Sequence, residues 1–134
     1  MVYPVTQINP ETAKKHGIKD GDWIWIESPR GRIRQVARVF PGIDPRVVMA
    51  TGNWFYPEEP APQHGVTISN PNMLTSNDHF DPMYGAPDLT CLLCKICKVE
   101  KEDMQDLPKS ALVLQKDGDI GTVPLGQDGK IGKK

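Results

Sequence analysis

Three cysteines lie at a spacing that could bind a metal: Cys91, Cys94 and Cys97 form a C-x-x-C-x-x-C run. Closely spaced thiolates are ligands of zinc and of iron–sulfur centres. The run lacks a fourth cysteine, and the apolar and β-branched residues around it predict a strand over residues 91–99. Because side chains alternate between the faces of a strand, Cys94 would point away from the other two. We therefore interpret the three as small, buried or half-buried thiols, and an iron–sulfur or zinc protein stays an alternative hypothesis.

A second group of polar residues lies in a long segment, residues 53–89, that is rich in proline, asparagine and aromatic side chains. Asn70 and Asn72 each offer a donor and an acceptor, so they could bind the edge of a pterin or a purine. Carboxylates such as Asp78 and Asp81 could accept hydrogen bonds from guanine or ribose. The same residue types also build turns, and residue chemistry alone leaves both interpretations open.

The sequence contains none of the common catalytic motifs, neither a nucleophile elbow nor a P-loop, a zinc-protease helix or a Rossmann glycine pattern. Its histidines are scattered: His16 follows a predicted helix, and His64 and His79 are candidate ligand contacts in the 53–89 segment. The net charge of −1, without a basic block, argues against nucleic acid as the partner. No apolar run approaches the length of a membrane span. Cytoplasm is the default compartment, and the periplasm is the alternative if a partner carries the export signal.

Short strands must hold these residues in place, because 13 prolines and 12 glycines favour strands and turns over long helices. One short helix is predicted, with Asn9 as N-cap, Pro10 at the first position and Gly17 after the end. Hairpins and one helical crossover predict a mainly β domain, a small closed barrel. Strands are predicted over residues 23–28, 32–39, 47–51 and 91–99.

The strand over residues 32–39 has two distinct faces. One face carries Ile33, Ala37 and Val39 together with Gln35, and we expect this face in the core. The other face carries Arg32, Arg34 and Arg38 together with Val36 and is expected to be wet.

Three further expectations concern burial and domain limits. The apolar run of residues 47–51 predicts a strand buried on both sides. The barrel is expected over residues 5–100, and residues 101–134 form a polar, glycine-rich extension that is largely mobile, with one weak strand around residues 112–114.

Three ordered segments resemble the C-terminal domain of the molybdopterin oxidoreductases, the dimethyl sulfoxide reductase superfamily. The first is residues 8–22, with its Asn-Pro helix start and its Gly-Ile-Lys-Asp-Gly-Asp ending. The second is the predicted strand pair around the Ser-Pro-Arg-Gly turn of residues 28–31, ending in the Pro-Gly of residues 41–42. The third is Asn70-x-Asn72-x-Leu74-Thr75, followed by Asp81-Pro82, by residues 85–87 and by a last strand.

This resemblance implies a double-psi β-barrel that binds molybdopterin guanine dinucleotide. In this family two copies of the cofactor usually surround one molybdenum or tungsten, and the metal's protein ligand belongs to a different domain. The resemblance therefore implies neither a catalytic residue nor a metal ligand in this chain. Matched to the family's cofactor-binding positions are Gly52, Asn53, Trp54, Phe55, Asn70, Asn72, Leu74 and Thr75, and also Asp81 and Lys95 as late polar positions.

Family members reach the Asn-Pro helix after an earlier strand, but only eight residues precede Asn9 here. We therefore expect the barrel to lack its first strand and to be completed by the remaining domains or by the catalytic subunit of a molybdopterin oxidoreductase. The isolated chain would then have no turnover. The alternative is a double-psi barrel that serves as an adaptor or protein-interaction module without a cofactor.

Overall fold

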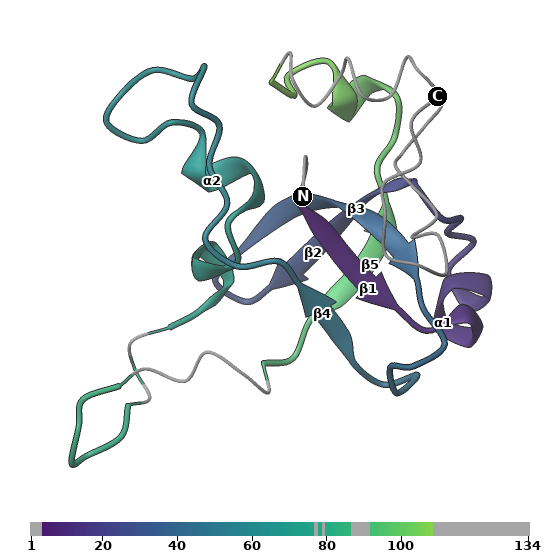
Figure 1. The fold of residues 1–134 in the computed structure, drawn as a ribbon, viewed down its shortest axis with the longest axis horizontal. Coiled ribbons are helices and arrows are strands. Elements are labelled where there is room, and N and C mark those ends of the chain that lie inside the picture. The colour runs from purple at the N-terminus through teal and green to yellow at the C-terminus, as the bar shows by residue number, and fades with distance from the viewer. Residues whose placement is uncertain (1–3, 77, 79, 87–91, 109–134) are drawn as a thin grey trace, which may run out of the picture.

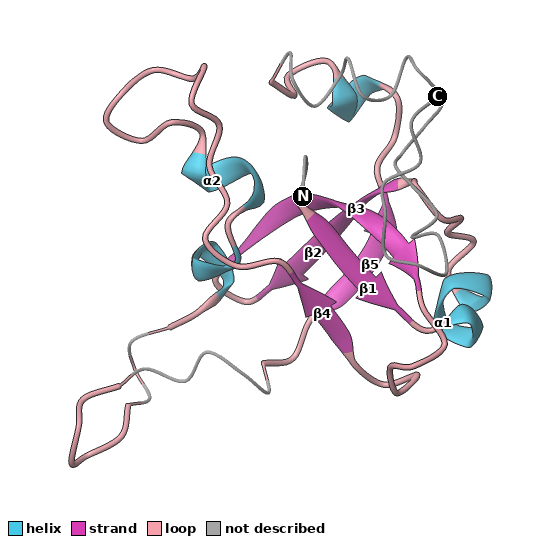
Figure 2. Ribbon diagram, viewed as in Figure 1, coloured by secondary structure: helices cyan, strands magenta, loops and turns pink. Residues whose placement is uncertain are grey.

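A five-stranded sheet forms the centre of the computed structural model, which describes residues 4–76, 78, 80–86 and 92–108 (Figure 1). The strand order is β4-β1-β3-β2-β5, with β1 and β3 parallel and the other neighbours antiparallel. Short helices and long loops surround the sheet (Figure 2), so the prediction of a mainly β chain is confirmed, although the chain has more short helices than the one predicted. The strands are β1 (Val5–Ile8), β2 (Trp23–Ser28), β3 (Gly31–Val39), β4 (Val48–Ala50) and β5 (Lys95–Lys98). The helices are α1 (Pro10–Lys15), α2 (Val66–Ser69) and the 3-10 helices η1 (Pro71–Leu74) and η2 (Glu102–Met104).

Helix α1 forms as its local sequence predicts. The Asn9 side chain accepts a hydrogen bond from the Glu11 amide (2.9 Å), and Gly17 leaves the helix with a φ of 64°. The Ile18 amide then donates to the carbonyl of Ala13 (2.9 Å), which folds the chain back so that both side chains enter the core. The longest helix in the described part of the chain is α1, with six residues, so no described helix could span a membrane.

No strand was predicted ahead of Asn9, and β1 corrects this prediction. Strand β1 pairs with β3 on one side and with β4 on the other. Its four residues alternate between half-buried and buried, but one of the two buried side chains is the polar Thr6. A run this short and mixed carries little local strand signal, and its pairing depends on partners far along the chain.

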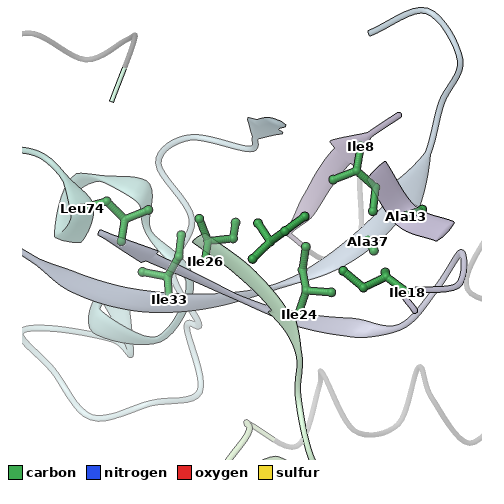
Figure 3. Packing of buried hydrophobic residues seen from close by; sticks show 9 residues of the cluster. Ile8, Ala13, Ile18, Ile24, Ile26, Ile33, Ala37 and Leu74 are labelled. Carbon is green, nitrogen blue, oxygen red and sulfur yellow. The ribbon is translucent and has the colours of Figure 1, made fainter. Parts of the chain in front are cut away.

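The core lies between the sheet, α1 and η1 (Figure 3). Isoleucines supply most of it, and Ile8, Ile24 and Ile33 are fully buried. Burying a side chain of this size stabilises the fold by roughly 1.5–3 kcal/mol before the entropy of ordering is subtracted. The cluster comprises Ile8, Ala13, Ile18, Ile24, Ile26, Ile33, Ala37, Leu74 and Ile96.

The middle of the second face of β3 is buried, which corrects the prediction for Arg34 and Val36, while Arg32 and Arg38 are exposed as predicted. Both side chains are buried, at 5% and 3% exposure. A second apolar cluster covers this face, and it joins strand residues to Tyr56 from the long loop and to Leu107 from beyond β5. The sequence could not show this cover, because its residues come from segments with no strand periodicity. The cluster contains Trp23, Val36, Tyr56, Val99 and Leu107, with Trp25, Trp54, Ile68 and Met104 packed against it.

The prediction for residues 47–51 was wrong in burial and in length. Strand β4 is an edge strand of three residues, and Met49 is 60% exposed. Val48 and Ala50 pack against the core, while Val47 remains 49% exposed. An apolar run of this length fits both an edge strand and a central strand, and only the sheet order decides between them.

The cysteine-bearing strand is shorter than predicted. β5 contains Cys97, which is half-buried, whereas Cys94 precedes the strand and is exposed. Desolvation by neighbouring protein atoms raises the pKa of both thiols. Cys91 lies outside the described residues, and among those described no three histidine, cysteine or acidic side chains gather as a metal site would require.

Residues 100–108 pack against the sheet. The prediction of a mobile extension with a weak strand concerns mainly residues 109–134, which lie outside the described residues.

Candidate functional site

The two segments with the most predicted cofactor residues, 52–55 and 70–75, lie next to each other beyond the end of β4. The Asn70 side-chain amide donates a hydrogen bond to the backbone carbonyl of Trp54 (3.3 Å). The structure thus brings together two stretches that are separated by a loop in the sequence.

A buried glutamine holds the starts of both segments. Gln35, with no exposed surface, donates from its amide to the carbonyls of Thr51 (2.9 Å) and Ser69 (2.8 Å). Its side-chain oxygen accepts from the Thr6 hydroxyl (2.7 Å) and from the Thr51 amide (3.2 Å). Each of these bonds fixes the position of a strand or loop, because a buried polar group that loses its partner destabilises the fold. We call Gln35, Thr6, Thr51 and Ser69 the polar network.

Gln35 was predicted on the core face of its strand, but no role was predicted for it. Its signal was available: it is the one polar side chain between Ile33 and Ala37 on an otherwise apolar strand face. A buried amide in such a position must find partners, so it marks a place where backbone from other segments approaches.

Ser69 extends the polar network to the loop. Its hydroxyl donates to the carbonyl of Arg34 (2.6 Å) and forms a second hydrogen bond with the phenol of Tyr56 (2.8 Å). Burial raises the pKa of Tyr56, so the phenol stays protonated at neutral pH. The residues on either side of the predicted site, Tyr56 after Phe55 and Ser69 before Asn70, are therefore bonded to one another.

The turn over residues 70–75 divides its predicted site residues into two kinds. Asn70 is 6% exposed, and its side-chain oxygen accepts from the Asn72 amide (3.0 Å), so it builds the turn. Leu74 is 8% exposed and belongs to the core, and its carbonyl accepts from the Ser28 hydroxyl (3.0 Å). The Asn72 side chain is exposed, and the half-buried Thr75 donates its hydroxyl proton to the Asn72 carbonyl (3.0 Å).

The segment over residues 52–55 presents backbone and rings. Gly52 is exposed, and a Cβ placed there would meet nothing within 4 Å, so the backbone is open to a ligand. Asn53 takes a left-handed φ of 55°, a conformation asparagine tolerates better than most residues. Trp54 packs edge-on against Tyr56 with ring centres 6.4 Å apart, while Phe55 is 53% exposed.

Asp81 and Lys95, the two late polar positions, lie in other segments, and the hydrogen bonds described for Asp81 are local. The Asp81 carboxylate accepts from the amides of Met83 (2.9 Å) and Tyr84 (2.8 Å) within its own turn. Lys95 is exposed at the start of β5, opposite Glu27 in the register.

Two other polar candidates also have local partners, and a third lies outside the described residues. The Asp78 carboxylate bonds to the Ser76 hydroxyl. A ring nitrogen of His64 bonds to the Glu59 carbonyl (2.8 Å), and this local bond accounts for the position of the ring. His79 lies outside the described residues.

The exposed groups at this end of the sheet fit an uncharged polar heterocycle. Asn53 and Asn72 carry amides that both donate and accept, and the Gly52 backbone is accessible. The segments 52–55 and 70–75 contain no charged residue. Such a surface can orient a ring through hydrogen bonds and aromatic contact, and it holds no nucleophile or acid–base pair of its own.

A β-rich domain with this kind of site is a binding domain, and comparison with known proteins identifies its class. The family model of the molydopterin dinucleotide binding domain matches residues 1–92. The chain belongs to this family.

Similar proteins are much longer than this chain. It is 40% identical over 86 residues to dopamine dehydroxylase from Eggerthella lenta, which covers 64% of the chain and 8% of that protein. It is 35% identical over 88 residues to the arsenate respiratory reductase molybdopterin-containing subunit of Shewanella sp. strain ANA-3, covering 61% of the chain and 10% of the relative. The solved acetylene hydratase from Pelobacter acetylenicus superimposes with a TM-score of 0.67 at 27% identity, over 72% of this chain and 14% of the other. The chain thus spans about a tenth of the length of the relatives it matches.

Proposed function

We propose that this chain holds molybdopterin guanine dinucleotide, in the bis form with molybdenum or tungsten bound outside the chain, as part of a larger oxidoreductase. The observation that carries the proposal is the polar network, which fixes segments 52–55 and 70–75 side by side and leaves their outer groups accessible. When bound, the cofactor supplies the metal-centred redox chemistry. The chain supplies binding, orientation and exclusion of water.

Within this proposal the predicted site residues have different tasks. Asn72 and Asn53 bind polar edges of the cofactor, and the exposed Phe55 ring covers part of its surface. Asn70 and Leu74 act as positioning residues, because their side chains are engaged within the protein. The backbone of Gly52, the half-buried Trp54 and the hydroxyl of Thr75 border the ring system. Asp81 and Lys95 remain predicted contacts for a more distant part of the cofactor.

We also propose that a strand from the rest of the larger protein completes this sheet as a double-psi β-barrel. The edges β4 and β5 are not paired with each other in the described residues, so the sheet is open. Edge strands are commonly protected by charge. Lysines begin and end β5, whereas β4 reads Val-Met-Ala without a charge. This contrast favours β4 as the edge that accepts the additional strand.

Asn72→Ala should test the binding role. In the assembled molybdopterin protein, loss of one amide that bonds the cofactor should make cofactor release roughly fivefold faster, as expected for about 1 kcal/mol of lost hydrogen bonding. Cofactor content after gel filtration, measured over time, reports this. Lys14→Ala removes an exposed side chain from α1, which carries no predicted cofactor residue, and should leave release unchanged.

Equal cofactor retention in the Asn72→Ala and Lys14→Ala variants would contradict the site. A stable assembly that contains this chain but no pterin would instead favour the adaptor function.

An exposed apolar turn supports the proposal of a larger assembly. Residues 80–86 form a turn that lies away from the sheet (Figure 1), and the Asp81 amide donates to the Ala86 carbonyl (2.9 Å). Phe80, Met83 and Tyr84 are 60%, 84% and 85% exposed on it. Ordered apolar side chains exposed to this degree are typical of contact surfaces, here for the remaining domains.

The double variant Met83→Ser/Tyr84→Ser should leave the Tm of the chain unchanged, because neither side chain is buried. It should weaken association with the rest of the oxidoreductase about tenfold or more, since truncating central apolar contacts commonly costs above 1 kcal/mol each. Phe40→Ser, at a 44% exposed ring in another loop, is the matched control. Isothermal titration measures the affinity of each variant for the rest of the oxidoreductase. Equal affinities of the double variant and of Phe40→Ser would disprove this docking role.

A further inference from the structure

Arg34 connects the segment after β5 to the proposed cofactor site. Its terminal nitrogens donate to both carboxylate oxygens of Asp106, one of them at 3.1 Å, and to the backbone carbonyl of Asp103. The guanidinium is buried, and its Nε has no hydrogen-bond partner among the described residues. The bonds to residues 103 and 106 therefore determine where this side chain lies. A two-pronged guanidinium–carboxylate pair is also a geometrically specific contact.

The backbone of Arg34 is bonded to the proposed cofactor site. The backbone carbonyl of Arg34 accepts the hydrogen bond from Ser69, and Ser69 bonds to Tyr56. Arg34 therefore binds residues 103 and 106 through its side chain, and through its backbone it binds the loops that carry the predicted cofactor residues.

Apolar packing provides a second, independent connection. Leu107, 4% exposed, lies in the same cluster as Tyr56, and Met104 packs against that cluster together with Trp54 and Ile68. Side chains from residues 104–107 and from residues 54–68 thus cover one face of the sheet as one layer. Figure 1 shows η2 and α2 above the sheet in the same view.

Two arginines of β3 stack on the Trp25 ring of β2, beside this layer. The guanidinium carbons of Arg32 and Arg34 lie 4.1 and 4.8 Å from the ring centre of Trp25. Contacts of this kind favour a fixed orientation of the arginines. The hydrogen bond from Arg34 lowers the pKa of Asp106, so the carboxylate is ionised at neutral pH.

We propose that residues 100–108 are a positioning element for the cofactor loops: through Arg34 and through the cluster shared by Leu107 and Tyr56, they set the place of residues 54–56 and 68–70. The family model ends at residue 92, so this segment lies beyond the matched domain. Its functional meaning rests on the proposed function, whereas its effect on the loops does not. Residues 100–108 would then determine how firmly the cofactor loops are held against the sheet.

Hydrogen–deuterium exchange of the full 134-residue chain, free of cofactor, tests this directly. Asp106→Ala should speed exchange at the amides of Tyr56, Ile68 and Asn70 about fivefold, the factor that a loss of roughly 1 kcal/mol of local stability produces. These amides bond to carbonyls within the loops. The amides of Ala37 and Phe40, bonded to Asp22 and Ile8, should keep their rates.

Two further variants make the result specific. Asp44→Ala removes a carboxylate from a surface ion pair with the exposed Arg46 and should leave the loop amides unchanged. Asp106→Glu keeps a carboxylate within reach of the guanidinium and should restore most of the protection.

The proposal is overturned if Asp106→Ala speeds exchange only within residues 103–107, if it speeds exchange equally everywhere, or if Asp106→Glu is as damaging as alanine. Because no cofactor is present, these outcomes are independent of the Asn72→Ala experiment.

Discussion

Gln35→Ala should lower the free energy of unfolding of the chain by about 3 kcal/mol, because it leaves several buried polar groups without partners. The groups affected are the hydroxyl of Thr6 and the backbone carbonyls of Thr51 and Ser69. Urea denaturation followed by tryptophan fluorescence measures the change, since Trp23 and Trp25 lie on the sheet. The loss should appear as a lower midpoint with an unchanged slope.

Gln7→Ala is the matched control for this experiment. Gln7 lies on the neighbouring strand β1, is half-buried, and makes no side-chain hydrogen bond in the described part of the chain. Its replacement should cost no more than about 0.5 kcal/mol. Similar losses in the two variants would mean that the polar network does not hold the fold together as proposed.

Leu74→Ala should destabilise the chain by about 2–4 kcal/mol, the usual range when a buried leucine is truncated. Leu74 is one of the predicted cofactor-binding residues, but its side chain packs with the core isoleucines (Figure 3). Its effect on cofactor binding should therefore follow the loss of stability. Chemical denaturation of the chain and cofactor retention in the assembled protein separate the two effects.

The neighbouring Met73 supplies the control for Leu74. Met73 is 38% exposed in the same 3-10 helix, and Met73→Ala should cost less than about 1 kcal/mol. A Leu74→Ala variant with normal stability and weak cofactor retention would instead place this side chain on the ligand.

The predicted site residues therefore form two groups. One group is exposed and can contact a ligand, and the other group positions the first. Asn53, Asn72 and Phe55 are exposed and can contact a cofactor. Asn70 and Leu74 are engaged within the protein, and the polar network centred on Gln35 lies beneath them. Substitutions in the first group should alter binding at constant stability, and those in the second should alter both.

Local signals in the sequence were sufficient for several elements. The Asn-Pro start and the Gly17 end predicted α1, because caps act over a few residues. The aromatic and β-branched residues of β2 and the short turn after it predicted the β2–β3 hairpin, whose two strands pair in register from residue 23 to residue 36. The resemblance to the molybdopterin oxidoreductases also came from ordered sequence segments, and the match over residues 1–92 confirms it.

What only the tertiary structure decided involves partners distant in sequence. Strand β1 pairs with β3 and β4, so its short, mixed sequence gave no prediction by itself. Arg34 looked exposed because it is charged, yet Asp106 and the layer that includes Leu107 bury it. Asn70 and Asn72 look alike in the sequence. The Asn70 side chain, however, accepts a hydrogen bond within the turn, whereas the Asn72 side chain is exposed. The sequence by itself determined the class of the domain and its local elements, because those depend on neighbouring residues; burial and the division of the site depend on contacts that form only when the chain has folded.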